Sequence, residues 1–363
     1  MLISKGLLMR QLVLLSAALF LTLSGCSNET PPLKSYESTF ATESFVRKHL
    51  LTKEGLIRTN ISDRQHEFLS ESIGLYLLFL VDQKREDEFA NQIDIFKHYF
   101  LDESNLVSWR LEQTGDDITA SPVNAWIDDA RIIHALSKAA EVFNEPTYTK
   151  LAEKISTALT TKGVKDGLPV DYVDLTTNET GDVLTLSYLD EAALRYMPSS
   201  NNLYLNSKQL LEEAPLQGPF FAKSYSISDQ KYHFDDEINM IDQLYVAIRY
   251  EQFNLETDVF YDFFKEQFNQ GLVYGRYDLD SKEPAVNYES QAVYALAIFY
   301  LLERDEKEFA ETIMKHLKTF MISDSSSEYY GGYIDVSNKE THSFDNLLPL
   351  LAEGGLLDGY VIP

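Results

Sequence analysis

The chain has 363 residues, a hydrophobic content of 44% and a formal net charge of −26. A charge of this sign and size argues against nucleic acid or anionic lipid as a partner, because both need basic patches, and it favours a neutral or cationic ligand. The chain can bury a large core, and its length alone would suggest two domains.

The N-terminus has the features of an export signal. Two basic residues precede an apolar run over 12–23, which is too short for a comfortable membrane span but suits a signal-peptide core. The run ends at Leu23-Ser24-Gly25-Cys26, which resembles a bacterial lipobox, a signal in which the cysteine receives diacylglycerol. An ordinary signal peptide with an accidental cysteine is the alternative. We therefore expect a signal peptide over 1–25 and attachment to the extracellular face of the cell membrane through Cys26.

The residues after the signal peptide read as a tether followed by one domain. Removing 1–25 removes Lys5 and Arg10 but no acidic residue, so the mature chain would carry a formal charge of −28. Cys26 is the only cysteine, which excludes an intramolecular disulfide and a cysteine-rich zinc site. The polar stretch 26–35 is typical of a flexible tether. We expect a single domain over 36–363 and a monomer.

A repeat organises this domain. Short segments rich in glycine, aromatic and β-branched residues interrupt the helical pattern at intervals of roughly fifty to sixty residues, which is typical of an array of supersecondary units. The six segments are 55–58, 106–110, 167–172, 218–221, 271–277 and 330–335. The helical patterns that follow them cover 67–82, 123–143, 183–197, 237–250, 288–303 and 344–353. These are unusually apolar, so we expect them to be buried, whereas the preceding helices, such as 86–99 and 306–320, are amphipathic.

Six outer helices alternating with six inner helices predict an all-α fold, an (α/α)6 toroid of six helical hairpins. A hairpin alone cannot bury its inner helix, so the six must close into one domain. The alternative is that the segments are edge strands of an α+β fold, but they are too short and too widely separated to build one sheet. All six should lie at one end of the toroid, and binding residues are expected there.

Acidic residues stand near the start of the inner helices. They are Glu71, Asp128, Asp129, Asp190, Glu191, Asp235, Asp236, Glu289 and Asp345. Acids in a first helical turn often only stabilise the helix dipole or cap the helix, and this explains most of them. It explains Glu71 less well, because no charge follows it until after Val81. Desolvation in such an apolar helix would raise the pKa of Glu71, which suits a general acid.

Aromatic residues gather at the same end of the expected toroid. They are Trp109, Trp126, Tyr188, Tyr277, Tyr288, Tyr329 and Tyr330. Flat rings beside carboxylates suit a carbohydrate site, because sugar C–H faces stack on rings while hydroxyls bond to acids and amides. Any single tyrosine can equally be a packing residue.

Several stretches resemble glycoside hydrolase family 8. Residues 70–78 resemble the family's Ser-Glu-Gly-Gln-Gly-Tyr-Gly-Met stretch, and 124–136 resemble its Ala-Thr-Asp-Ala-Asp-Leu-Asp-Ile-Ala-Tyr-Ala-Leu helix. Phe234-Asp235 resembles the family's Tyr-Asp pair that opens the fourth inner helix. Residues 237–245 and 342–350 are similar to a Gram-positive lipoprotein branch of the family associated with exopolysaccharide systems. The family fold is an (α/α)6 barrel, so the likeness spans most of the mature chain.

The resemblance implies roles for individual carboxyls. Glu71 matches the family's general acid and Asp235 its general base. The second acid of the family's Asp-Ala-Asp falls on Asp129, which would hold the distorted sugar, and Asp128 takes this role if the register is off by one. The family inverts the anomeric centre, which requires the two carboxyls to be about 6.5–9.5 Å apart so that water can enter. The family's arginine after the base falls on Ile238, and this departure leaves the substrate open.

The resemblance and the aromatic pattern together predict a substrate surface. It comprises Trp109, Asn124, Trp126, Asp128, Tyr188, Arg276, Tyr277 and Tyr288. The sequence contains no His-x-x-x-His pair, no glycine-rich nucleotide motif and no Gly-x-Ser-x-Gly elbow. We therefore expect no metal, no cofactor and no serine-hydrolase chemistry.

These features predict an endo-acting glycoside hydrolase that cleaves an extracellular polysaccharide by an inverting mechanism. A second hypothesis is a polysaccharide lyase on a similar toroid, for which only Asn124 and His134 speak. The acidic cleft disfavours the uronate substrate that such a lyase needs. A saccharide-binding lipoprotein without turnover is a third. The sequence does not name the sugar.

Overall fold

The structure, a computed structural model, describes residues 38–197 and 202–358. The expected signal peptide over 1–25 and the tether over 26–35, including Cys26, lie outside the described residues. Those that are described all belong to one unit. None of their helices is long and apolar enough to cross a membrane.

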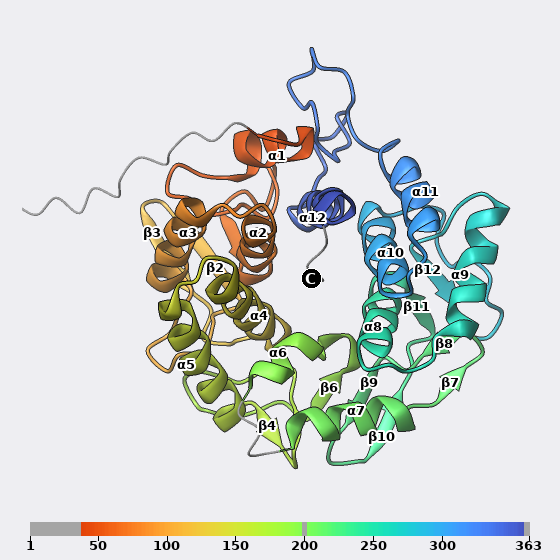
Figure 1. Ribbon diagram of the computed structural model, residues 1–363, viewed down its shortest axis with the longest axis horizontal. Coiled ribbons are helices and arrows are strands. Elements are labelled where there is room, and N and C mark those ends of the chain that lie inside the picture. The colour runs from red at the N-terminus through yellow and green to blue at the C-terminus, as the bar shows by residue number, and fades with distance from the viewer. Residues whose placement is uncertain (1–37, 198–201, 359–363) are drawn as a thin grey trace, which may run out of the picture. The chain divides into compact units, whose positions relative to one another are not determined.

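An inner ring of helices surrounds the axis of this unit (Figure 1). Its members are α2 (Ser70–Asp82), α4 (Trp126–Val142), α6 (Glu191–Tyr196), α8 (Met240–Gln252), α10 (Gln291–Glu303) and α12 (Phe344–Asp358). Neighbouring inner helices pack on one another, with the short helix η2 (Leu186–Tyr188) beside α8 between α6 and α8, and α12 closes the ring by packing on α2.

A second set of helices lies outside the first. They are α1 (Ala41–Phe45) with its continuation η1 (Val46–Leu50), α3 (Glu86–Tyr99), α5 (Pro146–Lys162), α7 (Leu203–Glu213), α9 (Asp258–Gln270) and α11 (Lys307–Leu317). Each outer helix leads through a turn into the next inner helix, so the predicted all-α (α/α)6 toroid is confirmed.

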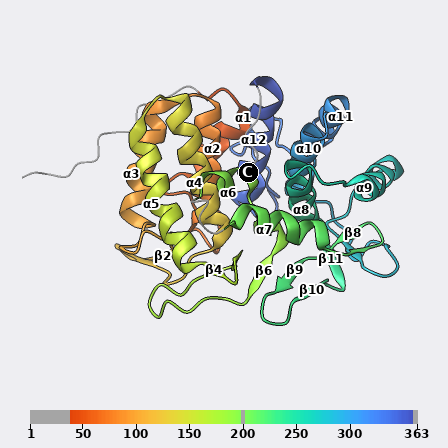
Figure 2. The same ribbon diagram turned by 60° about the horizontal axis from the view of Figure 1, so that its bottom comes forward.

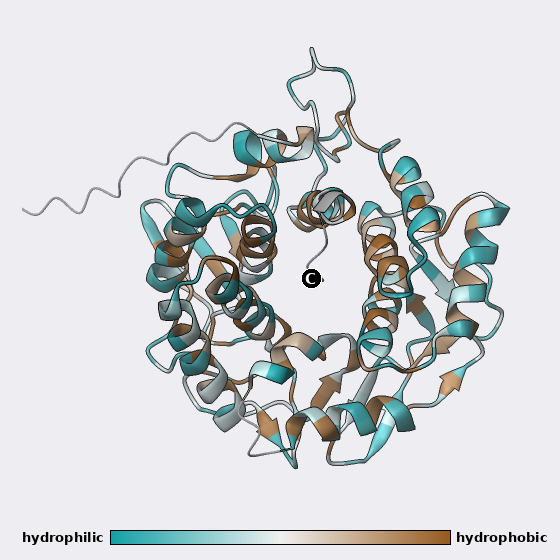
Figure 3. Cartoon of the chain, in the orientation of Figure 1, coloured by the Kyte–Doolittle hydropathy of each residue, from teal (hydrophilic) through white to brown (hydrophobic). Residues whose placement is uncertain are grey.

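Hydropathy separates the two rings, as Figure 3 shows. In α10 every residue from Ala292 to Leu301 is buried, so this helix has no polar face. In α11 the buried residues are Ala310, Ile313, Met314 and Leu317, a spacing of three and four that marks one face of a helix. An inner helix is therefore enclosed by its neighbours, whereas an outer helix buries one stripe and leaves the rest to solvent.

Short strands occupy one end of the ring, where outer helices lead into inner ones (Figure 2). They are β1 (Glu67–Leu69), β2 (Arg110–Thr114), β3 (Asp117–Ala120), β4 (Val164–Lys165), β5 (Leu168–Pro169), β6 (Val183–Thr185), β7 (Leu216–Gln217), β8 (Phe220–Phe221), β9 (Ser224–Ser226), β10 (Lys231–His233), β11 (Glu237–Asn239) and β12 (Arg276–Asp278). They pair antiparallel in small sheets ordered β1-β2-β3, β10-β9-β6, β11-β12, β4-β5 and β7-β8. A single sheet of edge strands is thus excluded.

Two inner helices differ from the expected boundaries. The third was expected over 183–197, but its first residues form β6 and η2, and α6 has only six residues. The fourth was expected from 237, but 237–239 form β11, which pairs with β12, and α8 begins at Met240. Asp235 and Asp236 therefore precede a strand and do not lie in a first helical turn.

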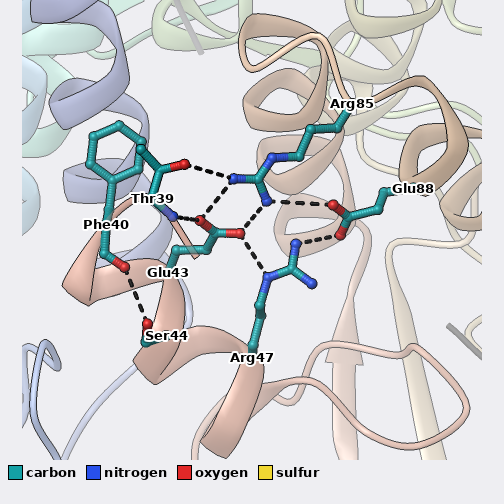
Figure 4. A network of polar contacts seen from close by, with 7 residues as sticks. All are labelled: Thr39, Phe40, Glu43, Ser44, Arg47, Arg85 and Glu88. Carbon is teal, nitrogen blue, oxygen red and sulfur yellow. Dashed lines mark hydrogen bonds and ion pairs between the residues drawn. The ribbon is translucent and has the colours of Figure 1, made fainter. Parts of the chain in front are cut away.

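A buried ion network fastens α1 and η1 to the start of α3 (Figure 4). The Glu43 carboxylate accepts from Arg47 Nε at 2.7 Å and from both terminal nitrogens of Arg85, and it has no exposed surface. Glu88 in turn binds Arg47 and Arg85. Two carboxylates shared by two guanidinium groups thus join the first two outer helical segments, which lie about forty residues apart in the sequence.

Removing one member of this network should destabilise the ring. Glu43→Ala leaves two cations facing a single carboxylate, and breaking a buried pair typically costs about 3–5 kcal/mol. Urea unfolding should show this loss, while Glu86→Ala at the exposed start of α3 should be nearly neutral. Equal stability of the two variants would contradict the role of the network.

The same carboxyl should make stability depend on pH. Burial acts to raise the pKa of Glu43, but the hydrogen bonds and charges of Arg85 and Arg47 outweigh it, and the pKa lies below its ordinary value of 4.5. The contribution of Glu43 to stability is therefore present above pH 4.5 and is lost as the pH falls through the lower folded-state pKa.

Candidate active site

The site begins at Glu71, in the first turn of α2. Its two neighbours fix the backbone to adjoining elements. Ser70 Oγ donates to Asp128 Oδ2 of α4 at 2.6 Å, and Ser72 Oγ shares a hydrogen bond of 2.8 Å with Ser343 Oγ, just before α12. The start of α2 is thus bound to α4 on one side and to the segment before α12 on the other, and these two hydrogen bonds set the position of Glu71.

Glu71 lines a cavity of about 360 Å³ at the strand-bearing end of the ring. Arg276 and Tyr288, two expected substrate contacts, line the same cavity, and Tyr288 is 52% exposed. The other lining residues are Asn239, Ile241, Gly275, Ser290, Val293, His342, Phe344 and Asp345. A second cavity of about 670 Å³ shares His342 and Asp345 with the first, so the two adjoin there. The structure therefore brings Glu71, Arg276 and Tyr288 together.

The surroundings of Glu71 favour its protonated form. Burial raises the pKa of Glu71 to about 7, the negative charges of Asp128 and Asp345 act in the same direction, and Arg131 and Arg64 oppose them. Near neutral pH the carboxyl is therefore divided between its protonated and ionised forms. That is the state a general acid needs.

The two adjacent acids of α4 have different surroundings. Asp128 is 5% exposed and pairs with Arg131 at 2.8 Å. Asp129 has no exposed surface and accepts from Val107 N at 3.1 Å and from Asn124 Nδ2 at 2.9 Å.

Asn124 Oδ1 also accepts from Val173 N at 2.6 Å. Asn124 and Asp129 thus tie two turns to α4, and the structure places neither side chain where a sugar could reach it. Asp128 was the alternative to Asp129 as the acid that holds the sugar. Of these two acids, it is Asp128 whose charge raises the pKa of Glu71.

Two of the expected aromatic contacts are core residues. Trp126 and Tyr277 have no exposed surface. The Tyr277 hydroxyl accepts from Tyr274 N at 3.0 Å, and its ring packs on Phe263. Neither ring can stack on a sugar in this structure, because each lies beneath the turns that the sequence pattern associated with the cleft.

Other rings remain at the surface of this end. Trp109 is partly buried beneath the Arg110 guanidinium, 4.9 Å from the ring centre, and its carbonyl accepts from Ser70 N at 3.0 Å. Tyr172, which was not among the expected contacts, is 48% exposed. The sequence could have indicated Tyr172 as a substrate contact, because it lies in the third interrupting segment, next to Asp171.

Asp235 lies on the segment before β11 and is not among the residues that line the cavity of Glu71. Its side chain is 44% exposed and pairs with Lys223 at 2.5 Å. Asp236 is exposed. The acid in the first turn of α8 is Asp242, which accepts from Ser187 Oγ at 3.4 Å, and burial raises its pKa although Lys223 opposes this. The sequence prediction missed Asp242 because it started the helix three residues early, and it missed Lys223 because no local pattern links that residue, between β8 and β9, to Asp235.

Tyr188 feels the charge of both groups of acids. Burial raises the pKa of its hydroxyl, and Asp171, Asp128, Asp242 and Glu71 all act in the same direction. Carboxylates from several elements thus make this end of the toroid acidic. Among residues 38–197 and 202–358, no group of three or more His, Cys, Asp or Glu side chains is placed to hold a metal ion.

The chain is similar to a known bacterial protein over most of its length. It is 38% identical over 326 residues to the "Putative lipoprotein YdaJ" of Bacillus subtilis (strain 168), and the match covers 88% of each chain. The chain matches no family model.

Solved structures share its fold. A structure described as a novel alpha-amylase from Clostridium perfringens has a TM-score of 0.79 at 26% identity, covering 86% of this chain and 96% of that one. PssZ from Listeria monocytogenes has a TM-score of 0.74 at 27% identity, covering 89% and 97%. Endoglucanase Cel10 from Klebsiella pneumoniae, a family 8 glycosyl hydrolase, has a TM-score of 0.63 at 15% identity, covering 86% and 98%, and this likeness is one of fold.

Proposed function

Because the chain belongs to the family of the protein described as "Putative lipoprotein YdaJ" and shares the fold of family 8 glycosyl hydrolases, we propose that it is a lipoprotein of that hydrolase family and hydrolyses the glycosidic bonds of an extracellular polysaccharide. One observation carries the proposal. Glu71 is a partly buried carboxyl with a pKa of about 7, fixed at the start of an inner helix and facing a cavity. A carboxyl in that state can give a proton to the oxygen of a leaving sugar.

The reaction needs a second carboxyl on the other face of the sugar. Glu71 protonates the glycosidic oxygen as its bond to the anomeric carbon breaks. Asp235, paired with Lys223, accepts a proton from the water that attacks that carbon. Attack from the opposite face inverts the anomeric centre, and the acid and the base regain their starting states by exchanging protons with solvent.

The electrostatics of the site restrict the substrate. Carboxyls from α2, α4, α8 and α12 contribute negative charge around Glu71 and Tyr188, so we expect a uronate to meet more repulsion than a neutral sugar. Two adjoining cavities suit a polymer that extends beyond the cleaved bond. A neutral exopolysaccharide cut within its chain fits both features.

A polysaccharide panel tests the function. The mature domain is incubated with starch, xylan, chitosan, a soluble cellulose derivative and the extracellular polysaccharide of the producing bacterium. Starch is included because the Clostridium perfringens structure is described as an alpha-amylase. We expect new reducing ends without new ultraviolet absorption, and a product that has the inverted anomer by NMR. Ultraviolet absorption from a new double bond would indicate a lyase. Binding of a polymer without cleavage would indicate a saccharide-binding protein.

Membrane attachment should depend on Cys26 alone. A diacylglycerol supplies two acyl chains, and two chains suffice for stable anchoring. Cys26→Ala should release or mis-process the protein in fractionated cells, while the purified domain keeps its fold. Ser27→Ala is the matched control and should stay in the membrane fraction. A Cys26→Ala protein that still carries lipid would disprove the anchor.

A further inference from the structure

His342 and Asp345 lie where the two cavities adjoin, and the mechanism above uses neither. Both residues line both cavities, and Glu71 lines the smaller one with them. His342 Nδ1 accepts from Phe344 N at 3.1 Å. An imidazole nitrogen that accepts carries no proton, so in the neutral ring the proton is on Nε2. In the described part of the chain no hydrogen bond to His342 Nε2 is found.

The segment that carries these side chains is rigidly held. Ser343 N donates to Thr59 O at 2.8 Å, and Ser343 Oγ bonds to Ser72 Oγ beside Glu71. The wholly buried Asn346 donates to His342 O at 2.8 Å. The directions of the imidazole and of the first turn of α12 are therefore set before any ligand binds.

The Asp345 carboxylate has no partner among the residues that the structure describes: neither a hydrogen bond nor an ion pair reaches it. It is partly buried, and burial raises its pKa to about 6, with a smaller effect of Glu340 in the same direction. A carboxylate that lines both cavities and makes no hydrogen bond within the protein is free to accept from a ligand there. A fixed donor and an unused acceptor thus stand side by side next to the proposed acid.

We propose that His342 and Asp345 together bind two neighbouring hydroxyls of the sugar unit next to Glu71. The Nε2–H of His342 donates to one hydroxyl oxygen, and the Asp345 carboxylate accepts from the next hydroxyl. This site rests on the proposed function and narrows its substrate. It selects a neutral sugar with a free pair of adjacent hydroxyls. At the position facing His342 it disfavours an ammonium, which cannot accept from Nε2–H, and at the position facing Asp345 it disfavours an ester, which cannot donate to the carboxylate.

His342 stays neutral at pH values well above 4, so its protonation does not disturb this arrangement near neutral pH. Burial lowers the pKa of His342 to about 4, the charge of Arg64 acts in the same direction, and Glu67 opposes them. Asp345 has a second effect, because its negative charge favours the protonated form of Glu71. The other charges on Glu71 come from Asp128 and Arg131 of α4 and from Arg64 before β1.

Steady-state kinetics on the panel polymer that the wild-type protein hydrolyses fastest test the site. His342→Ala should raise KM about tenfold, which corresponds to one lost hydrogen bond of about 1.4 kcal/mol, and should change kcat less. His342→Gln keeps an N–H donor and should recover part of the loss, and it replaces the alanine variant if that variant does not fold. Asp345→Asn should raise KM and also shift the alkaline limb of kcat/KM to lower pH, because Glu71 loses a negative neighbour.

The control and the opposing outcomes separate this site from the proposed function. Asp324→Asn removes the same charge from an exposed turn and should change neither KM nor the pH profile. Wild-type KM values in both the His342→Ala and the Asp345→Asn proteins would overturn the hydroxyl site and leave the hydrolase in place. If the wild-type protein hydrolyses no polymer of the panel, the proposed function fails and the site that rests on it fails too.

Discussion

Glu71→Gln should nearly abolish hydrolysis while leaving the fold intact and saccharide binding measurable. Glutamine keeps the shape and hydrogen-bonding capacity of the side chain but has no proton to give to the leaving oxygen. General acid–base groups typically contribute about 10²–10⁴-fold to a rate, so kcat should fall by at least that factor. Turnover of the panel polymer and calorimetric binding of its oligosaccharide products measure the two effects separately.

The pH profile provides a second test of the same residue. A general acid works only when protonated, so wild-type kcat/KM should fall as the pH rises through about 7, the raised pKa of Glu71. The residual activity of Glu71→Gln should lack that limb. A profile that stays flat from pH 6 to pH 8 in the wild-type protein would contradict the role of Glu71 as the acid.

At alkaline pH, Glu71→Gln should lower activity without lowering stability. The pKa of Glu71 is raised from 4.5 to about 7 on folding, so the stability associated with its protonated form is present below pH 4.5 and is lost as the pH rises through about 7. Glu71→Gln removes the desolvated charge and should unfold at the same temperature as the wild-type protein, or higher, at pH 8. Glu86→Gln, in the exposed first turn of α3, is the matched control and should change neither property. Full activity in Glu71→Gln would refute the assignment of catalytic roles.

Hydrophobic periodicity predicted the toroid because each hairpin is a local unit. The helix expected over 86–99 is α3, and both of its predicted boundaries are confirmed, because its apolar stripe and its charged first turn lie within the helix itself. The periodicity failed at residues 237–239, where Ile238 is paired across to Tyr277 about forty residues away. A strand is stabilised by such a distant partner, which a local pattern does not contain. The short α6 has the same cause, because β6 pairs with β9.

The site was predicted less completely, because side-chain direction changes with every residue. Successive residues of a helix point about 100° apart, so Asp128 and Asp129 face different neighbours although they share the same sequence signal. Trp126 and Tyr277 show a similar ambiguity, since an aromatic residue near a turn can either cap the core or line the cleft. Glu71 could be singled out because it is the one charged residue of α2 before Asp82, a signal that lies within the local sequence.

Asp235→Asn should reduce hydrolysis as strongly as Glu71→Gln. The amide keeps the size of the side chain but cannot take a proton from the attacking water, so kcat should fall by about 10²–10⁴-fold. The losses should not add in the double variant, because the two groups act on one transition state. Asp236→Asn is the matched control. Asp236 is exposed, whereas Asp235 pairs with Lys223. Asp236→Asn should therefore leave the rate of hydrolysis nearly unchanged.

The structure adds Asp242→Asn to this series. Asp242 occupies the position in the first turn of α8 that the sequence assigned to Asp235, and burial raises the pKa of its carboxyl. If Asp235 activates the water, Asp242→Asn should retain much more activity than Asp235→Asn, because Asp242 then only contributes to the field around Lys223. The opposite ranking would place the base on α8 itself. In that case the start of the helix, and not the segment before β11, would carry the water-activating group, and Asp235 would serve to neutralise Lys223.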